Sequence, residues 1–467
     1  MSTPTTDDPQ ELAPTPNPPP LSPPPLSAPI PSLQIPSPPI PSPPIPGTRR
    51  SATFAALSNL NFRRFFYGQA VSMIGTWMQS VAQSWLVLEL TGSGTALGLV
   101  IALQTIPVLF GAPYAGLIAD RVDKRRLLVG TQTTMGILAL VLGLLTVTGT
   151  VQLWMVYVLA IALGAANAVD NPTRQAFVLE MVGPTHLRNA VTLNSVLVNA
   201  ARAIGPAVAG TLIATIGVGI CFLVNAGTFV AVIVALGTLN RSALRPSPPA
   251  PRAKGQLREG FAYVRQTPSL VVPLGMMAVI GMLAYEFQVV LPVIARSTYH
   301  GGAQAYGFLT AAMGVGAVIG GLGVASRAFT GTRALVWSAA IFGGVILLAA
   351  AAPNLALACV AMALVGAGSV GFLAIGNATL QLSASPMMRG RVMALWAVAF
   401  LGSTPIGGPI AGYVSQHFGG RAGLVLGGVS CLVAAVGGWY VLRRAAARSD
   451  GLAEAEPKVT EHAPVAA

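Results

Sequence analysis

Twelve apolar segments alternate with short polar connectors between residues 65 and 442. Each segment is close to the ~20 residues that an α-helix needs to cross a bilayer. A longer polar and basic stretch separates the first six segments from the last six. The pattern predicts an all-α integral membrane protein with twelve transmembrane helices in two six-helix halves. The predicted spans are 65–90, 95–118, 127–149, 153–170, 190–216, 219–239, 269–294, 304–325, 334–352, 355–382, 391–416 and 422–442.

The polar stretches define the predicted boundaries of the domains. Half of the 37 prolines lie in the first 47 residues, where they favour extended, disordered polyproline II over helix or sheet. In the central linker, apolar positions recur at helical spacing beside arginines, which predicts a short helix at 256–265 lying on the membrane surface. The expected regions are a disordered cytoplasmic tail at 1–62, an N-terminal half at 63–239, a cytoplasmic linker at 240–267, a C-terminal half at 268–444 and a disordered C-terminal tail at 445–467.

The composition excludes a water-soluble protein. Of the 467 residues, 53% are hydrophobic and 9% are charged, whereas soluble domains average about 25% charged residues. The apolar stretches run continuously, unlike the ~10-residue alternating segments of a membrane β-barrel. The formal net charge of +13 does not indicate nucleic-acid binding, because 24 of the 27 Lys and Arg lie in the tails and in the even-numbered connectors. This asymmetry predicts that both termini are cytoplasmic.

No sequence pattern indicates an enzyme, a cofactor or a metal site. The four histidines are scattered without ligand spacing, and no phosphate-binding Gly-rich loop with a Gly-Lys-Ser/Thr ending occurs. The stretch 366–371 (GAGSVG) spells a dinucleotide fingerprint, but it lies inside a transmembrane segment, where small residues serve helix packing. The cysteines lie in apolar runs, so no disulfide framework is expected; they are Cys221, Cys359 and Cys431.

The two halves resemble each other in sequence. Segment five contains IGPAVAG at 204–210, and segment eleven contains IGGPIAG at 406–412. A repeat of six spans joined by a cytoplasmic linker is typical of transporters that rock two halves around a central site. Channels also contain repeats, but no ring of charges or filter-like repeat is evident here.

The connector after segment two carries the strongest motif. Gly116 is followed four residues later by Asp120 and Arg121, then by a basic cluster that includes Arg125. The motif resembles the cytoplasmic loop signature of the major facilitator superfamily. The resemblance implies the fold of that superfamily. It also implies that these four residues gate the conformational change, with the arginines pairing with Asp120, and that they do not touch substrate.

Further motifs narrow the resemblance. Gly205 and Pro206 in segment five resemble the Gly-Pro motif of superfamily exporters, which kinks the helix, allows tight packing and implies export. With GTWMQ at 75–79 and DNPTRQ at 170–175, the chain is similar over residues 60–440 to the branch that contains the enterobactin exporter and related drug or macrolide efflux proteins. That branch lacks the intramembrane arginine that many drug/proton antiporters carry in segment four, and so does this sequence.

Polar residues of the first segment recur every three or four positions and therefore share one helical face. Unpaired amides are costly in lipid, so this face should line a water-filled cavity or bond to partner helices. In the superfamily fold, helices one, four, seven and ten line the cavity, which adds candidates from segments four and ten. The predicted cavity residues are Gln69, Ser72, Thr76, Gln79, Gln83, Asn167, Asp170, Asn377 and Gln381.

Charged residues inside the spans are few. Glu286 alone among the acidic residues falls in the middle of a span, where a charge costs ~2.5–3.5 kcal/mol on insertion scales. It should be protonated, paired or exposed to water, so it is a candidate for carrying a coupling proton, together with Asp170. A structural hydrogen bond, or a pairing with Arg202, is the alternative. Arg202 is either an anion contact in the cavity or a buried structural cation.

These features predict a secondary active transporter of the bacterial cytoplasmic membrane that exports a small organic molecule by alternating access. The proton is the expected counter-ion, the cargo is a siderophore, a drug or a hydrophobic metabolite, and the protein is expected to be a monomer without nucleic-acid partners. Two alternatives remain open at this stage. The same fold could import a nutrient or lipid, or a transport-inactive sensor could recruit a partner through the proline-rich tail.

Overall fold

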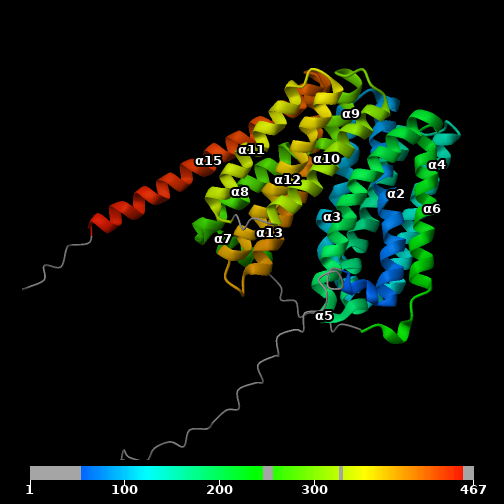
Figure 1. Ribbon diagram of the computed structural model, residues 1–467, viewed down its shortest axis with the longest axis horizontal. Helices are drawn as coiled ribbons and strands as arrows, with labels where there is room; N and C mark the ends of the chain where they lie inside the picture. Colours follow the sequence, from blue (N-terminus) through cyan, green and yellow to red (C-terminus); the bar gives the residue numbers. More distant parts are fainter. Residues whose placement is uncertain (1–53, 246–255, 326–329, 456–467) are drawn as a thin grey trace, which may run out of the picture. The chain divides into compact units, whose positions relative to one another are not determined.

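The computed structural model describes residues 54–245, 256–325 and 330–455, all within the unit Arg50–Ala467. These residues form helices joined by short connectors and no strand (Figure 1). Large apolar side chains are exposed along the outer faces of the helices, as at Ile319, Leu322 and Trp337. An apolar surface of this extent is typical of a protein whose outer face is covered by lipid.

The helices follow the predicted spans in order. The first half comprises α2 (Leu60–Thr91), α3 (Gly94–Arg121), α4 (Lys124–Val147), α5 (Leu153–Ile216) and α6 (Val218–Gly237). The second half comprises α8 (Pro268–Leu283), α9 (Phe287–Ser297), α10 (Ala303–Ala325), α11 (Thr332–Ala351), α12 (Leu355–Ser383), α13 (Arg389–Leu401), α14 (Thr404–His417) and α15 (Gly420–Ala455). The short helices are η1 (Ala55–Ser58), η2 (Arg241–Ala243) and α7 (Gln256–Gln266).

The twelve predicted spans are confirmed once two helices are considered individually. Ten helical stretches of the described residues are long and apolar enough to cross a membrane. One of them, α5, has 64 residues and would be about 96 Å long if straight, three times the hydrocarbon thickness. Gly183 interrupts it with φ 68 and ψ 176, so α5 supplies two spans. The remaining span is α2, whose polar stripe lowers its hydropathy.

Two predicted spans are interrupted helices. Segment seven is divided into α8 and α9 by a non-helical turn that ends at Glu286. Segment eleven is divided into α13 and α14. Pro405 explains the second interruption, since a proline in the first turn of α14 cannot donate a main-chain hydrogen bond to the preceding turn. Nothing in the continuous apolar run of segment seven indicates the first interruption.

The regions at the ends and the linker differ in detail from the predicted boundaries. The helix α15 continues to Ala455, so the predicted C-terminal tail begins inside a helix. The predicted surface helix is present as α7, where Glu259 forms an ion pair of 3.0 Å with Arg391 of α13. The proline-rich stretch up to residue 53 lies outside the described residues.

The two halves meet through glycines at one end of the helices. A Cβ added to Gly98 of α3 would lie 2.2 Å from the carbonyl oxygen of Gly408 of α14, and one added to Gly412 would lie 2.2 Å from that of Gly94. On the other side, α5 meets α10, where a Cβ on Gly307 would lie 2.6 Å from the carbonyl oxygen of Pro206. Small residues allow this backbone approach between membrane helices. We call the α3–α14 contact the glycine seam.

Candidate transport cavity

Two adjoining cavities lie between the halves. The first has a volume of about 350 Å³ and is lined mainly by α2 to α6. The second has a volume of about 220 Å³ and is lined mainly by the turn before α9, by α9 and α10, and by α13 and α14, with four residues of α2, α3 and α5. Because they share lining residues, they form one central site with two chambers. The shared residues are Trp77, Ile101, Thr105, Gln288 and Leu401.

Carboxamide side chains dominate the polar lining of the first chamber. Each carboxamide offers both a hydrogen-bond donor and an acceptor without a net charge. The chamber is therefore suited to a ligand with many neutral hydrogen-bonding groups and some apolar surface. The carboxamides that line it are Gln69, Gln79, Gln83, Gln104, Gln132, Asn167, Asn171, Asn225 and Gln288.

The predicted polar face of α2 points into this chamber. All five of its residues line the cavity, namely Gln69, Ser72, Thr76, Gln79 and Gln83. Some of them also bond to neighbouring helices: Asn225 Nδ2 donates to Gln79 Oε1 at 2.6 Å, and Gln83 Nε2 donates to Gln104 Oε1 at 3.4 Å. The two alternatives considered for this stripe therefore both apply. The side-chain amide oxygen of Gln69, Oε1, is buried without a hydrogen-bond partner.

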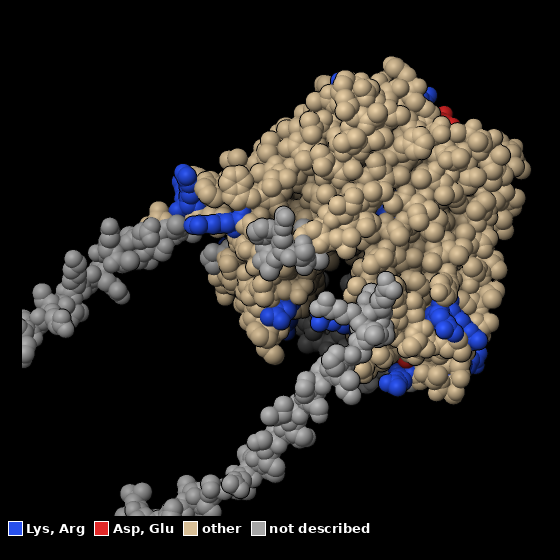
Figure 2. Space-filling model, viewed as in Figure 1, with Lys and Arg blue, Asp and Glu red and all other residues tan. Residues whose placement is uncertain are grey.

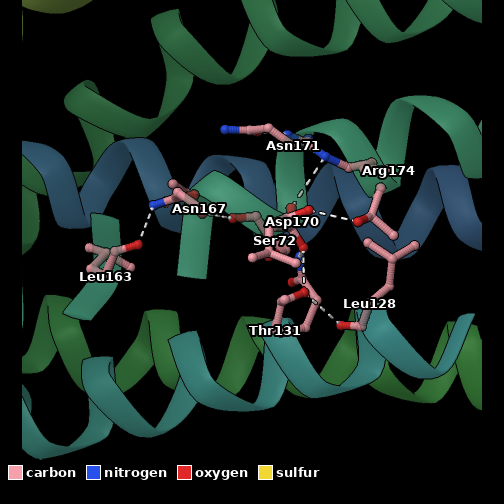
Figure 3. A network of polar contacts seen from close by, with 12 residues as sticks. Ser72, Leu128, Thr131, Leu163, Asn167, Asp170, Asn171 and Arg174 are labelled. Carbon is pink, nitrogen blue, oxygen red and sulfur yellow. Dashed lines mark hydrogen bonds and ion pairs between the residues drawn. The ribbon is translucent and has the colours of Figure 1, made fainter. Parts of the chain in front are cut away.

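Asp170 of α5 is the centre of a polar network in the first chamber (Figure 3). Its Oδ1 accepts hydrogen bonds from the Thr131 hydroxyl at 2.8 Å and from Gln132 Nε2 at 2.9 Å. Its Oδ2 lies 3.5 Å from the guanidinium Nε of Arg174, one helical turn away. Arg174 in turn donates to the Asn171 side chain at 2.7 Å. The Asp170 carboxylate thus has its partners in place.

Glu286 has a different environment in the second chamber. Its side chain is 4% exposed, and its Oε1 is buried without a hydrogen-bond partner. Arg202 lines the same chamber with its guanidinium carbon 5.1 Å from the centre of the Trp77 ring. No ion pair within 4.0 Å joins Glu286 to Arg202 in the described residues, so the alternative that Glu286 pairs with Arg202 is wrong for this conformation.

Asn377 and Gln381 do not line either chamber. Gln381 is exposed and its side-chain amide donates to Asn377 of the same helix. Both residues lie within the last two turns of α12, beyond the depth of the cavities. The prediction rested on segment ten lining the cavity in the superfamily fold, which does not determine how deep each of its residues lies along the helix.

The residues predicted to gate the transition lie at the α3–α4 connector. The surroundings of Gly116 and the side chain of Asp120 are outside what the structure describes, and Arg121 is exposed. Arg125 donates from Nε to the carbonyl oxygen of Leu236 at 2.5 Å and from its NH2 group to that of Gly237 at 3.0 Å. It therefore satisfies carbonyls at the C-terminus of α6, where a cation is favoured.

The Gly-Pro motif of α5 lies at a close helix contact. A Cβ on Gly205 would lie 2.6 Å from the Cβ of Trp77 and 2.8 Å from the carbonyl oxygen of Ile74, both on α2. The main chain of Pro206 contacts Gly307 of α10. One turn of α5 thus packs against a helix of each half, as the tight packing expected of this motif requires.

Several lining residues were not predicted. Gln104, Gln132, Asn225 and Gln288 are isolated carboxamides within apolar runs of α3, α4, α6 and α9. Since amides are costly in lipid, each could have been assigned to the interior from the sequence. A single polar residue does not reveal which cavity or neighbour it faces, whereas the repeated spacing on α2 does.

Comparisons with known proteins agree with this architecture. A family model described as transmembrane secretion effector matches residues 51–462. The staphyloferrin A transporter of Staphylococcus aureus is 24% identical over 361 residues, which cover 76% of this chain and 89% of that protein. The enterobactin exporter EntS of Escherichia coli is 27% identical over 356 residues, which cover 75% of this chain and 84% of the exporter.

Solved structures share the fold at low sequence identity. An inward-facing, unoccupied bacterial homologue of the human lysosomal transporter Spinster aligns with a TM-score of 0.66 at 15% identity, covering 85% of this chain and 98% of that one. The nucleoside transporter NupG aligns with a TM-score of 0.66 at 12% identity, covering 82% of this chain and 99% of that one. These likenesses confirm the predicted fold class.

Proposed function

Because the chain belongs to the transmembrane secretion effector family, a branch of the major facilitator superfamily of membrane transporters, we propose that it exports a small organic molecule from the bacterial cytoplasm by proton-coupled alternating access. The observation that carries the proposal is the central cavity, with its carboxamide lining, between two halves that touch through glycines at one end. Glu286 is the proposed proton carrier, and Arg202 and the predicted cavity residues that line the chambers are the proposed contacts for cargo.

The conformation fits a transporter that is closed to the outside. With both termini cytoplasmic, as the distribution of Lys and Arg predicts, the glycine seam is on the outer side of the membrane. Gln416 Oε1 supports the closure there by accepting hydrogen bonds from the Ser93 hydroxyl at 2.7 Å and from Thr95 Oγ1 at 3.0 Å. Figure 2 shows the surface hollowed between the halves on the side of α7 and α13, which this topology makes the cytoplasmic side.

The lining chemistry supports a particular kind of cargo. Neutral carboxamides make up much of the polar lining of the first chamber, which also includes the paired Asp170 and Arg174, while Trp77 lines both chambers and Arg202 the second. A molecule with amide, hydroxyl or catechol groups, some apolar surface and at most one or two acidic groups would find partners for each of these. The two named relatives are a transporter of staphyloferrin A and an exporter of enterobactin, so a siderophore is one candidate cargo, and an amphipathic drug is another.

Accumulation in cells tests the proposal. A panel of siderophores, drugs and dyes is supplied to an efflux-deficient host with and without the protein, before and after the proton gradient is collapsed. We expect lower accumulation of one chemical class, and loss of the difference when the gradient is collapsed. Gln79→Leu, which removes a lining carboxamide, should weaken the effect, whereas Gln381→Leu on the exposed end of α12 should not. Higher accumulation with the protein would indicate import and overturn the proposed direction.

A further inference from the structure

The interruption of segment seven leaves polar groups unpaired deep in the second half. The helix α8 ends at Leu283, and Glu286 precedes α9 with non-helical backbone angles of φ −81 and ψ 35. The main-chain N–H of Glu286 makes no hydrogen bond to the carbonyl oxygen of Met282 among the described residues. Residues 285 to 287 donate no main-chain hydrogen bond to the Met282 carbonyl oxygen among the bonds of the described residues, and Glu286 Oε1 is buried without a hydrogen-bond partner; an unpaired buried acceptor is costly.

The two acceptors lie beside the same glycine. A Cβ on Gly407 of α14 would lie 1.7 Å from the carbonyl oxygen of Met282 and 3.0 Å from Glu286 Oε1. A Cβ on the next residue, Gly408, would lie 3.5 Å from Glu286 Oε2. The absence of side chains at these two positions leaves room for the carboxyl group and brings it next to the free carbonyl.

From this geometry we infer that Glu286 and the main-chain carbonyl of Met282 form a proton-binding site, which the glycine face of α14 covers. The inference rests on the proposed export function and specifies where its coupling proton would be held. A proton on Oε1 turns that oxygen into a donor, which can bond to the Met282 carbonyl oxygen. Without the proton, two acceptors face each other in a site of low polarity, and the carboxylate needs water. Interrupted helices that expose carbonyls beside an acidic group are used in this way by membrane transporters.

The site is linked to the opening of the outer side through Gly408. One side of Gly408 faces the Glu286 carboxyl group, and its carbonyl oxygen touches Gly98 of the other half. When the glycine seam separates, Gly98 leaves Gly408, and water from the outer side can reach the carboxyl group. A proton can then be taken up from outside only in the outward-open state, as the exchange of exported cargo for protons entering down their gradient requires.

The other charged and titratable groups of the second chamber do not replace this proton. Arg202 of α5, Tyr285 beside Glu286 and Tyr306 of α10 line the same chamber. Arg202 makes no ion pair with Glu286, and the Tyr285 hydroxyl donates to the carbonyl oxygen of Ser369 at 2.8 Å. Thr404 of α14 also lines this chamber, and its neutral hydroxyl interacts with the Glu286 carboxyl group while Oε1 stays without a hydrogen-bond partner.

Infrared difference spectroscopy of the full-length protein in liposomes tests the site without any cargo. Spectra recorded in acidic and alkaline buffer should contain a carbonyl band from one buried protonated carboxyl group. We expect Glu286→Gln to remove this band, and Asp170→Asn and Glu89→Gln to retain it. Gly407→Ala, which leaves Glu286 intact, should shift the band because its methyl group separates the carboxyl group from the Met282 carbonyl. Gly344→Ala, which meets no atom within 4 Å, is the matched control.

Access to the site is measured by deuterium exchange of the same band. Exchange should be slow in the wild-type protein and faster in Gly98→Ala, whose methyl group opens the seam. A band that persists in Glu286→Gln protein, when the folded state of that protein is shown by a normal elution volume, would overturn the site. A band that changes when sodium is replaced by choline, and not when the pH is changed, would also overturn it. The spectroscopy measures no transport. If the band is present but the protein exports nothing in cells, the proposed function alone is rejected. Proton-driven export by Glu286→Gln would reject the site alone.

Discussion

Substitution of Gly98 by alanine should force the two halves apart on the outer side. The added Cβ would lie 2.2 Å from the carbonyl oxygen of Gly408, whereas carbon–oxygen contacts between packed helices are about 3.3–3.6 Å. The helices α3 and α14 must therefore separate by about 1 Å at this point. Neither atom can rotate away, because the position of a Cβ is fixed by its main chain and the Gly408 oxygen belongs to the main chain. Overpacking of this kind costs about 1–3 kcal/mol.

That cost is confined to the conformation in which the seam is closed. An outward-open conformation, in which α3 and α14 are apart, has no such contact and gains in population by the same free energy. A difference of about 1–3 kcal/mol shifts a two-state equilibrium by a factor of about 5 to 150. Gly98→Ala should therefore favour the outward-open state and reduce export, while the cavity residues themselves are unchanged.

Thiol labelling measures this shift. Leu97, which is fully buried and lines the first chamber, is replaced by cysteine in a protein whose three native cysteines have been removed. A membrane-impermeant reagent added from outside should label this cysteine several-fold faster in Gly98→Ala protein. Gly344→Ala, on a face of α11 with no atom within 4 Å, should leave the rate unchanged. Equal labelling rates in the wild type and Gly98→Ala would refute the assignment of the seam to the outer gate.

Two further substitutions test contacts around the cavity. Gln416→Leu removes the acceptor for Ser93 and Thr95, and it should raise the same labelling rate by less than Gly98→Ala does, since exposed hydrogen bonds contribute only about 1 kcal/mol in total. Gln381→Leu is the control. An unchanged rate in the Gln416→Leu protein would show that these bonds do not hold the seam closed. Asp170→Asn leaves the guanidinium of Arg174 without its carboxylate and should lower the free energy of unfolding by about 1–3 kcal/mol, seen as a lower Tm. The double variant Asp170→Asn/Arg174→Gln should recover part of that loss, whereas simple addition of the two single losses would argue against the pair.

The sequence predicts the spans and their order because lipid imposes a strong requirement on every segment. About 20 apolar residues are needed for each crossing, and the pattern is visible without knowledge of any contact. The stripe on α2 was predictable for a related reason, since five polar residues at helical spacing define a face and lipid excludes that face. For the spans and for this stripe, the single requirement that lipid-facing residues be apolar is sufficient for the prediction.

Features that depend on which helices meet could not be predicted in the same way. The sequence contains Gly98 and Gly408, but among 52 glycines nothing pairs these two. The interruption before α9 lies in an apolar run that is long enough for one uninterrupted span. Asn377 and Gln381 line neither chamber, because the expectation that segment ten lines the cavity does not state the depth of each side chain.

Which of the two acidic candidates can carry the coupling proton depends on the groups around each carboxyl group. Asp170 and Glu286 are both carboxyl groups that line one central cavity, and the sequence distinguishes them only by depth, since Asp170 ends its predicted span and Glu286 lies in the middle of one. Asp170 has two hydrogen-bond donors and a guanidinium around it, so a proton would displace existing contacts. Glu286 Oε1 has no hydrogen-bond partner and lies beside the same glycine as the Met282 carbonyl oxygen, so a proton on Oε1 can create a contact. A coupling group must gain and lose its proton in every cycle, and of the two carboxyl groups Glu286 is the one whose protonation breaks no ion pair of the described residues.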